Sequence, residues 1–162
     1  MIQSITIADT QMAIFILEDN SDRRLAMQVA VADRFAQYPT YFFATAGEFI
    51  DYLRRTDEMP LAISLDHDLD LIPIAEGRLI DPGSGRDVAD YLATQKPICP
   101  IVIHSSNAIA VTGMTMALED SGWDVHRVLP DADTAWIGTR WLREMRNAIV
   151  AAVSSEHAAV LP

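Results

Sequence analysis

Polar residues that can bind a metal ion or move a proton follow three separate apolar runs of this sequence. The runs cover residues 14–17, 61–65 and 101–103, and the polar clusters that follow them are Glu18-Asp19, Asp66-His67-Asp68 and His104-Ser105-Ser106-Asn107. Short apolar runs of this kind are typical of strands buried on both faces of a parallel sheet. Because ligands bind at the carboxyl ends of such strands, the three clusters predict one convergent site.

The acidic residues of these clusters predict a divalent metal site. Glu18, Asp19 and Asp66 would bring three like charges together, and a bound cation or a raised pKa would relieve their repulsion. Mg²⁺ is the simplest candidate because it prefers oxygen ligands. A nearby His67 or His104 would also suit Mn²⁺ or Zn²⁺. The alternative is that Glu18 and Asp19 only cap the next helix and interact with its dipole.

Asp66 is the predicted central carboxylate, and His104 is the predicted general acid or base. An aspartate at a strand end can hold a metal or act as a nucleophile, and imidazole exchanges protons near neutral pH. Ser105, Ser106 and Asn107 could donate hydrogen bonds to phosphate oxygens. The structural alternative is that Ser106 or Asn107 caps the next helix.

The sequence leaves the roles of His67, Asp68 and Arg127 open. His67 either faces the substrate or packs beneath the long segment after it, and Asp68 either contacts the substrate or forms an ordinary turn. Arg127 is a candidate cation for a phosphate group. A Ser-His-Asp hydrolase is disfavoured because no Gly-x-Ser-x-Gly elbow follows a strand, and Gly83-Ser84-Gly85 lacks the lysine of a phosphate-binding loop.

Strand-like and helix-like segments alternate along the chain, which predicts an α/β fold. We expect strands at residues 12–17, 41–44, 61–65, 101–103 and 123–129, with helices between and after them. This alternation is typical of a doubly wound parallel five-stranded sheet with helices on both faces. Five such units favour the receiver-like or flavodoxin-like strand order 2-1-3-4-5, in which the first and third strands flank the switch point.

Apolar spacing also predicts which residues face the core. The inner face of the first helix is expected to consist of Leu25, Val29, Ala32 and Ala36. The connection 66–85 is long, and its leucines and isoleucines predict that it packs against the domain. The last helix is expected to end near Val153 and to pack through Trp136, Trp141, Met145, Ala148 and Ile149.

Length, charge and leader signals bound the class of protein. The 162 residues fit one domain, expected at 1–153 with a flexible tail at 154–162. Residues 2–7 have the alternating pattern of a short strand, which would be either an extra edge strand or a loose arm. A formal net charge of -11 argues against an extended nucleic-acid surface, which would need cations to neutralise phosphates. No signal-peptide pattern or long apolar run is found, so we expect a cytoplasmic protein that does not span a membrane. The oligomeric state is not indicated.

The order of these residues resembles response-regulator receiver domains. Those domains carry an acidic pair after the first strand, a phosphorylatable aspartate after the third and a hydroxyl after the fourth, which correspond here to Glu18-Asp19, Asp66 and Ser105. A receiver also has a lysine before a proline at the end of its fifth strand, where this chain has Arg127-Val128-Leu129-Pro130. The histidine that ends the fourth run and the longer third connection are further departures.

These departures resemble one offshoot, the cyclic-phosphate processing receiver-like domains. The matching segments are Ser-Leu-Asp-His-Asp-Leu at 64–69, Gly-Arg-Asp-Val at 85–88 and Ile-His-Ser-Ser-Asn at 103–107. The resemblance implies a small phosphorylated ligand, either a cyclic nucleotide or an RNA end with a cyclic phosphate. The main hypothesis is a metal-dependent phosphoesterase or phosphate-ligand domain. The alternatives are a single-domain receiver phosphorylated on Asp66 and a non-catalytic nucleotide-sensing module.

Overall fold

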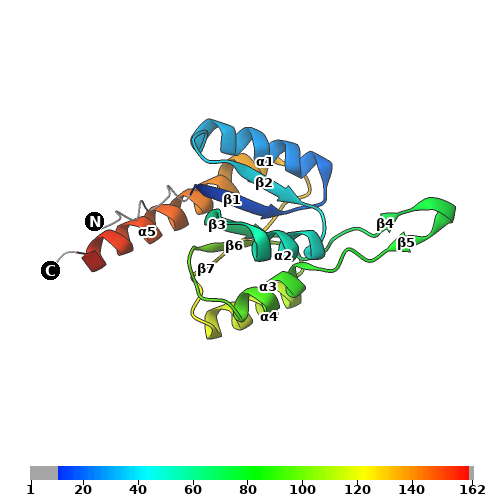
Figure 1. Ribbon diagram of the computed structural model, residues 1–162. Helices are drawn as coiled ribbons and strands as arrows, with labels where there is room; N and C mark the ends of the chain where they lie inside the picture. Colours follow the sequence, from blue (N-terminus) through cyan, green and yellow to red (C-terminus); the bar gives the residue numbers. More distant parts are fainter. Residues whose placement is uncertain (1–10, 161–162) are drawn as a thin grey trace, which may run out of the picture.

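A five-stranded parallel sheet forms the centre of the molecule (Figure 1). The computed structural model describes residues 11–160, so the strand expected at 2–7 lies outside the described residues. The strands are β1 (Met12–Leu17), β2 (Thr40–Phe43), β3 (Met59–Leu65), β6 (Ile101–His104) and β7 (Val125–Val128). Their order is β2-β1-β3-β6-β7, which confirms the predicted order 2-1-3-4-5.

Helices connect the strands and begin at polar caps. They are α1 (Ser21–Arg34), α2 (Ala46–Arg55), α3 (Gly85–Ala93), α4 (Ala108–Asp120) and α5 (Leu142–Val160), with a π-helical segment, η2 (Ile137–Trp141), directly before α5. The Asn20 side chain accepts hydrogen bonds from the backbone N–H groups of Asp22 and Arg23, and the Thr45 side chain accepts one from Glu48 N–H. Each cap satisfies amide donors that a helix start leaves unpaired.

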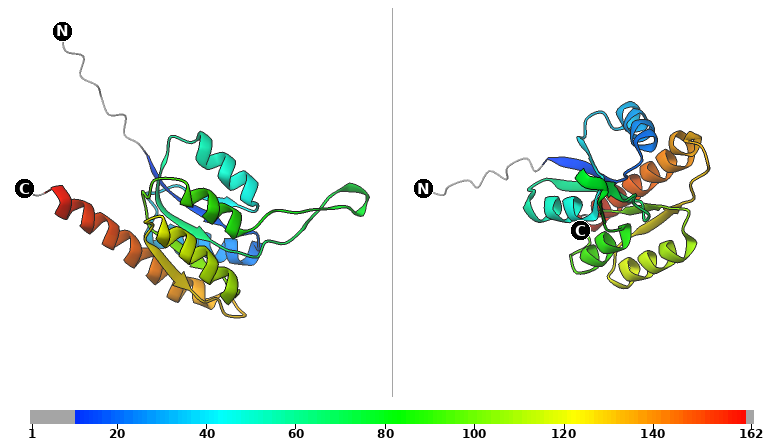
Figure 2. Two further views of the ribbon diagram at one scale, coloured as in Figure 1. Left: turned by 90° about the horizontal axis from the view of Figure 1, so that it is seen from below. Right: turned by 90° about the vertical axis from the view of Figure 1, so that its right-hand side faces the viewer.

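The helices cover both faces of the sheet (Figures 1 and 2). Residues of α1, η2 and α5 pack with Ile14 and Ile16 of β1 in one core cluster. Residues of α2, α3 and α4 pack with Phe15 and Leu17 in the other. Successive strand residues point to opposite faces, so burial of both faces explains why β1 is apolar throughout.

The inner face of α1 differs from the prediction. Met27, Ala30 and Val31 are buried, whereas Leu25 and Val29 are 62% and 66% exposed. The helix carries apolar residues at neighbouring positions from 25 to 31, so two helical stripes compete for the core. The path of the chain from β1 through α1 to β2 decides which stripe faces the sheet. The spacing of apolar residues along α1 cannot predict that orientation.

The connection between β3 and α3 projects from the domain as an arm, which we define as residues 70–82 (Figures 1 and 2). Two short antiparallel strands, β4 (Ile72–Pro73) and β5 (Leu79–Ile80), pair with each other across a 3-10 turn, η1 (Ala75–Gly77). The expected packing of this segment against the domain is therefore wrong for the arm. Leu79 and Ile80 are 59% and 48% exposed. Among the leucines and isoleucines of the described segment 66–85, Leu69, which precedes the arm, is the one that packs against the core.

The last helix is longer than expected. It continues to Val160 rather than ending near Val153, so helix occupies most of the segment expected to be a tail. The five predicted packing residues, Trp136, Trp141, Met145, Ala148 and Ile149, are all buried, as expected. Within residues 11–160, none of the helices has the length and apolar character needed to cross a bilayer.

Candidate metal centre

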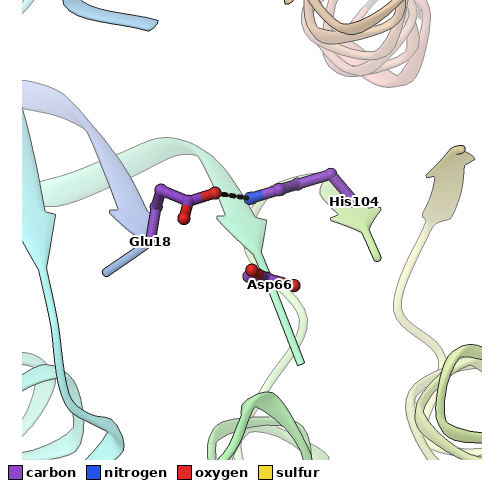
Figure 3. A group of neighbouring side chains, drawn as sticks. All are labelled: Glu18, Asp66 and His104. Carbon is purple, nitrogen blue, oxygen red and sulfur yellow. Dashed lines mark hydrogen bonds and ion pairs between the residues drawn. The ribbon is translucent and has the colours of Figure 1, made fainter. Parts of the chain in front are cut away.

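Glu18, Asp66 and His104 converge at the carboxyl ends of β1, β3 and β6 (Figure 3). In the sheet, Ile16 of β1 pairs with Ser64 of β3, and Ser64 pairs with Val102 of β6. Each of the three site residues lies two positions after one of these paired residues. Because side chains alternate between faces, the three reach the same face of the sheet at the same level. One ligand atom from each lies within 4.8 Å of the others, and all three residues are buried.

Glu18 and His104 interact directly across the end of β3 (Figure 3). His104 Nε2 lies 3.2 Å from Glu18 Oε2, and the backbone N–H of Asn20 donates to Glu18 Oε1 at 3.0 Å. Burial alone would raise the pKa of Glu18, but the hydrogen bond and charge of His104, with smaller help from Asn20 and Arg23, lower it below its ordinary value. Glu18 is therefore held as a carboxylate.

Asp66 is the carboxyl group of the cluster that most readily holds a proton. Burial, and then the nearby charge of Glu18, raise the pKa of Asp66 to about 6, although the charge of His104 opposes this. The backbone N–H of His67 donates to Asp66 Oδ1 at 2.7 Å. A cation at the cluster would favour the ionised form of Asp66.

Arg23 supplies positive charge to the cluster, and the sequence prediction missed it. Its Nη1 atom lies 3.2 Å from Asp66 Oδ2 and 3.7 Å from Glu18 Oε2. The Arg23 side chain is 29% exposed, so it links the buried carboxylates to the surface. The available signal was its place in the first turn of the helix capped by Asn20, which directly follows β1.

Ser64 and Trp141 extend the cluster into the core and were also missed. Ser64 Oγ lies 2.8 Å from His104 Nδ1 and 3.2 Å from the carbonyl oxygen of Val102, and it accepts a hydrogen bond from Trp141 Nε1 at 2.9 Å. Both residues are completely buried. A serine at a core position of a parallel strand is an unusual polar choice, and this was the signal in the sequence.

Asp19 is not among the residues that converge, although it was predicted to bind the metal with Glu18 and Asp66. Its Oδ2 accepts a hydrogen bond from the backbone N–H of Asp70 at 2.5 Å, at the base of the arm. It follows Glu18 by one position, so alternation turns it away from the cluster. The structure groups His104 with Glu18 and Asp66 in its place.

The other predicted residues lie around the cluster. His67 Nδ1 is 2.8 Å from Asp68 Oδ1, which also accepts a longer hydrogen bond, 3.4 Å, from Asn107 Nδ2. Asn107 Oδ1 accepts a hydrogen bond from Ala110 N–H at 3.1 Å and so caps α4. This agrees with the alternative prediction that Ser106 or Asn107 caps the next helix. Ser105 is buried, whereas Ser106 is exposed.

Arg127 lies on β7, apart from the carboxylates. It is exposed and lines a shallow depression with Ser105 and the first turns of α4. The cation that contacts the carboxylates is Arg23 of α1 instead. Arg127 could therefore contact a ligand only if the ligand also occupies the depression beside Ser105.

Gly85 fixes the connection that returns from the arm to α3. A Cβ at this position would lie 2.0 Å from the carbonyl oxygen of Asp66, which no side chain tolerates. The backbone N–H of Gly85 donates to His67 O at 3.0 Å, so the residues that flank the arm on either side join beside Asp66. This close approach explains the glycine of the Gly-Arg-Asp-Val segment.

The donor set fits a divalent cation. Two carboxylates and one imidazole are ligands that Mn²⁺ and Zn²⁺ accept, and carboxylates with water suit Mg²⁺. The second nitrogen of His104 faces Ser64 Oγ, and histidines that bind metals commonly make such a second hydrogen bond. The residues present are therefore chemically suited to hold the predicted metal.

Solved structures with the same architecture are response-regulator receivers, which confirms the receiver fold. The phosphorylated cyanobacterial phytochrome response regulator RcpA is 18% identical with a TM-score of 0.65, covering 87% of this chain and 95% of that chain. A CheY-like receiver from Methanospirillum hungatei is 13% identical with a TM-score of 0.64, covering 90% and 98%. The Mn²⁺-bound form of response regulator Rcp1 is 12% identical with a TM-score of 0.62, covering 85% and 92%.

Sequence comparison identifies the family within this fold. Residues 14–120 match the cyclic-phosphate processing receiver domain, and the chain belongs to that family. The resemblance seen in the sequence motifs is thereby confirmed. No curated protein sequence matches the chain.

Proposed function

We propose that this receiver-like domain binds a divalent cation through Glu18, Asp66 and His104 and opens a cyclic phosphate bound beside it. The observation that carries the proposal is the buried convergence of two carboxylates and an imidazole at three strand ends. Burial of such groups is costly unless they are paired or bind a cation. The family description, which concerns cyclic phosphates, supports the class of ligand.

Ring opening requires a water oxygen to bond to phosphorus while one ester P–O bond breaks and the leaving oxygen takes a proton. A bound cation would supply positive charge against the phosphoryl oxygens. Arg23 is the partly exposed cation of the cluster and would bind the phosphate from the solvent side. The predicted donors Ser105, Ser106 and Asn107 would contact phosphate oxygens from the start of α4.

The geometry favours His104 as a metal ligand over a free general acid or base. The ring is completely buried, and both nitrogens already face a partner, Glu18 on one side and Ser64 on the other. A general acid must reach the oxygen that it protonates. His104 would therefore act through the cation, and a solvent molecule would carry the proton.

The test is turnover of cyclic phosphates in the presence of Mg²⁺ or Mn²⁺. Phosphorus NMR of a panel of 2′,3′- and 3′,5′-cyclic nucleotides and of a short RNA with a cyclic end should show ring opening for at least one class. Asp66→Asn and Glu18→Gln should abolish turnover. Asp19→Asn is the matched control, because it removes a neighbouring carboxylate outside the cluster, and it should keep turnover within a few-fold. Binding without any turnover would instead select a sensing module.

A second candidate is a receiver that is phosphorylated on Asp66. The observation in its favour is the position of Asp66 at the end of the third sheet strand in a receiver fold. Against it stands the position of the single lysine, Lys96, which precedes β6 and lies toward the opposite end of the strands. Acetyl phosphate or beryllofluoride should distinguish the candidates: stable modification of wild type but not of Asp66→Asn would favour the receiver.

A further inference from the structure

Ser64 is a buried polar residue that none of the roles above uses. It lies within β3 between Ile63 and Leu65, two apolar residues that face the opposite core. A hydroxyl at such a position needs hydrogen bonds to compensate for lost water. Ser64 has three neighbours within hydrogen-bonding distance, which are Trp141 Nε1, His104 Nδ1 and the Val102 carbonyl oxygen.

The number of protons limits what these contacts can be. A serine hydroxyl has one proton to donate and two lone pairs that accept. Trp141 Nε1 is always a donor, so it occupies one lone pair of Ser64. The serine proton then goes either to His104 Nδ1 or to Val102 O. In a neutral imidazole, this choice decides which nitrogen of His104 carries the proton.

The two choices correspond to two states of the imidazole. When Ser64 donates to Nδ1, Nε2 carries the proton and donates to Glu18, as their separation of 3.2 Å permits. When Ser64 donates to Val102 O, its free lone pair accepts Nδ1–H, and the Nε2 lone pair of a neutral ring is left facing Glu18. That second arrangement is unfavourable beside a carboxylate unless a cation lies between the two groups.

We propose that Ser64, held by Trp141, is a positioning residue that presents the Nε2 lone pair of His104 to the divalent cation by accepting Nδ1–H. The inference rests on the proposed function, and it deepens it by assigning the residues that prepare the site. All hydrogen-bonding groups in the row Trp141–Ser64–His104 are then satisfied with the cation bound. To pass from the first state to the second, Nε2 gives up its proton, Nδ1 takes one up, and the Ser64 hydroxyl rotates from Nδ1 to Val102 O, without movement of a heavy atom.

The backbone supports this assignment through the π-helical segment η2. Positions five residues apart in a regular α-helix point about 140° from each other. The i to i+5 hydrogen bond from Leu142 N–H to Ile137 O widens this turn, and both Trp136 and Trp141 face the core. The π-helical geometry therefore allows Trp141 to contact Ser64 while Trp136 packs beside His104, with ring centroids 6.0 Å apart. Such segments occur frequently at functional sites.

The direct test is nitrogen NMR of the histidine rings in the whole chain, with and without Zn²⁺ as a diamagnetic probe. Without metal, His104 Nε2 should carry a proton. With saturating Zn²⁺, Nε2 should lose it and Nδ1 should show a slowly exchanging proton. If Zn²⁺ binds and Nδ1 remains without a proton, the inference is overturned while the proposed metal site stands. If no Zn²⁺, Mg²⁺ or Mn²⁺ binds, both fail.

Substitutions provide a second readout that does not depend on activity. Ser64→Ala should weaken metal binding about 10-fold to 100-fold by calorimetry, and Trp141→Phe should weaken it less, because Ser64 is retained. Trp123→Phe is the matched control, since it also removes a buried indole hydrogen bond, to Leu92 O at 3.0 Å, but on the other face of the sheet. Equal losses of metal affinity in Trp141→Phe and Trp123→Phe would overturn the inference.

Discussion

At the scale of single residues, Arg23 determines how the buried acidic cluster is neutralised. Its guanidinium contacts both Asp66 and Glu18, and its side chain is partly exposed. A divalent cation at the same carboxylates would repel this guanidinium, whereas a phosphate would attract it. Arg23 would therefore turn from the carboxylates toward the ligand when the site is loaded.

Arg23→Ala should accordingly bind metal more tightly and phosphate more weakly. Removing a competing cation should improve the Kd for Mn²⁺ by about tenfold, which is about 1.4 kcal/mol. The affinity of a cyclic nucleotide should fall by at least as much. Isothermal calorimetry measures both. Arg24→Ala is the matched control, because it removes the same charge one position away, where the guanidinium lies over the Phe42 ring at 5.6 Å.

Equal changes in Arg23→Ala and Arg24→Ala would contradict this role, because they would show a general effect of charge. A loss of metal affinity in Arg23→Ala would also contradict it. It would mean that the guanidinium supports the carboxylates in the loaded site rather than competing for them.

At the scale of elements, the sequence predicts the sheet and the convergence of Glu18 and Asp66 for one physical reason. Apolar runs that end in polar residues indicate where parallel strands end, and the ends of neighbouring strands meet. Glu18 and Asp66 follow from that rule, whereas Asp19 does not, because alternation turns it away. His104 was recognised as a site residue but was given the role of acid or base.

Contacts between elements could not be predicted in the same way. Ser64 and Trp141 are 77 residues apart and meet only because η2 packs across β3. Arg23 reaches the cluster because α1 starts at the end of β1 and turns back over it. The competing apolar stripes of α1 and the self-pairing of the arm are likewise decided by tertiary packing, which local periodicity does not contain.

The link between β7 and α5 gives a pH-dependent prediction at this scale. His126 of β7 is hydrogen-bonded through both ring nitrogens: Nδ1 lies 2.7 Å from Glu144 Oε1 of α5, and Nε2 lies 3.1 Å from Asp124 Oδ2. Burial would lower the pKa of His126, but its hydrogen bonds to Asp124 and Glu144 outweigh that effect and raise it. Because the pKa is higher in the folded state, protonated His126 stabilises the fold below about 6.5, its ordinary value. This stabilisation is lost as the pH rises through the higher folded value.

His126→Gln should therefore be less stable than wild type at pH 5.5, and the difference should shrink by pH 9. Urea unfolding at several pH values measures it. Glu144→Gln should show the same trend, since it removes one partner of the ion pair. A stability difference that stays constant with pH would show that His126 contributes by packing rather than by charge.

At the scale of the whole molecule, the arm is the feature that departs most from a compact domain. Antiparallel pairing places Ile72 opposite Ile80 and Pro73 opposite Leu79, so apolar side chains occupy both faces of the ribbon. A two-stranded ribbon alone is marginally stable in water. Its ends are held where Asp70 N–H donates to Asp19, the residue after Glu18, and where Ala46 N–H donates to Pro82 O.

This geometry predicts that the arm contributes little to the stability of the domain. Replacing residues 71–80 by a short Gly-Ser linker should change Tm by less than about 4 °C, which corresponds to less than about 1 kcal/mol, because the exposed side chains bury little apolar surface. Leu69→Ala is the contrasting variant. Leu69 packs against the core, so its truncation should cost about 1–3 kcal/mol. Thermal unfolding compares the two, and a larger loss from the excision would show that the arm folds back onto the domain.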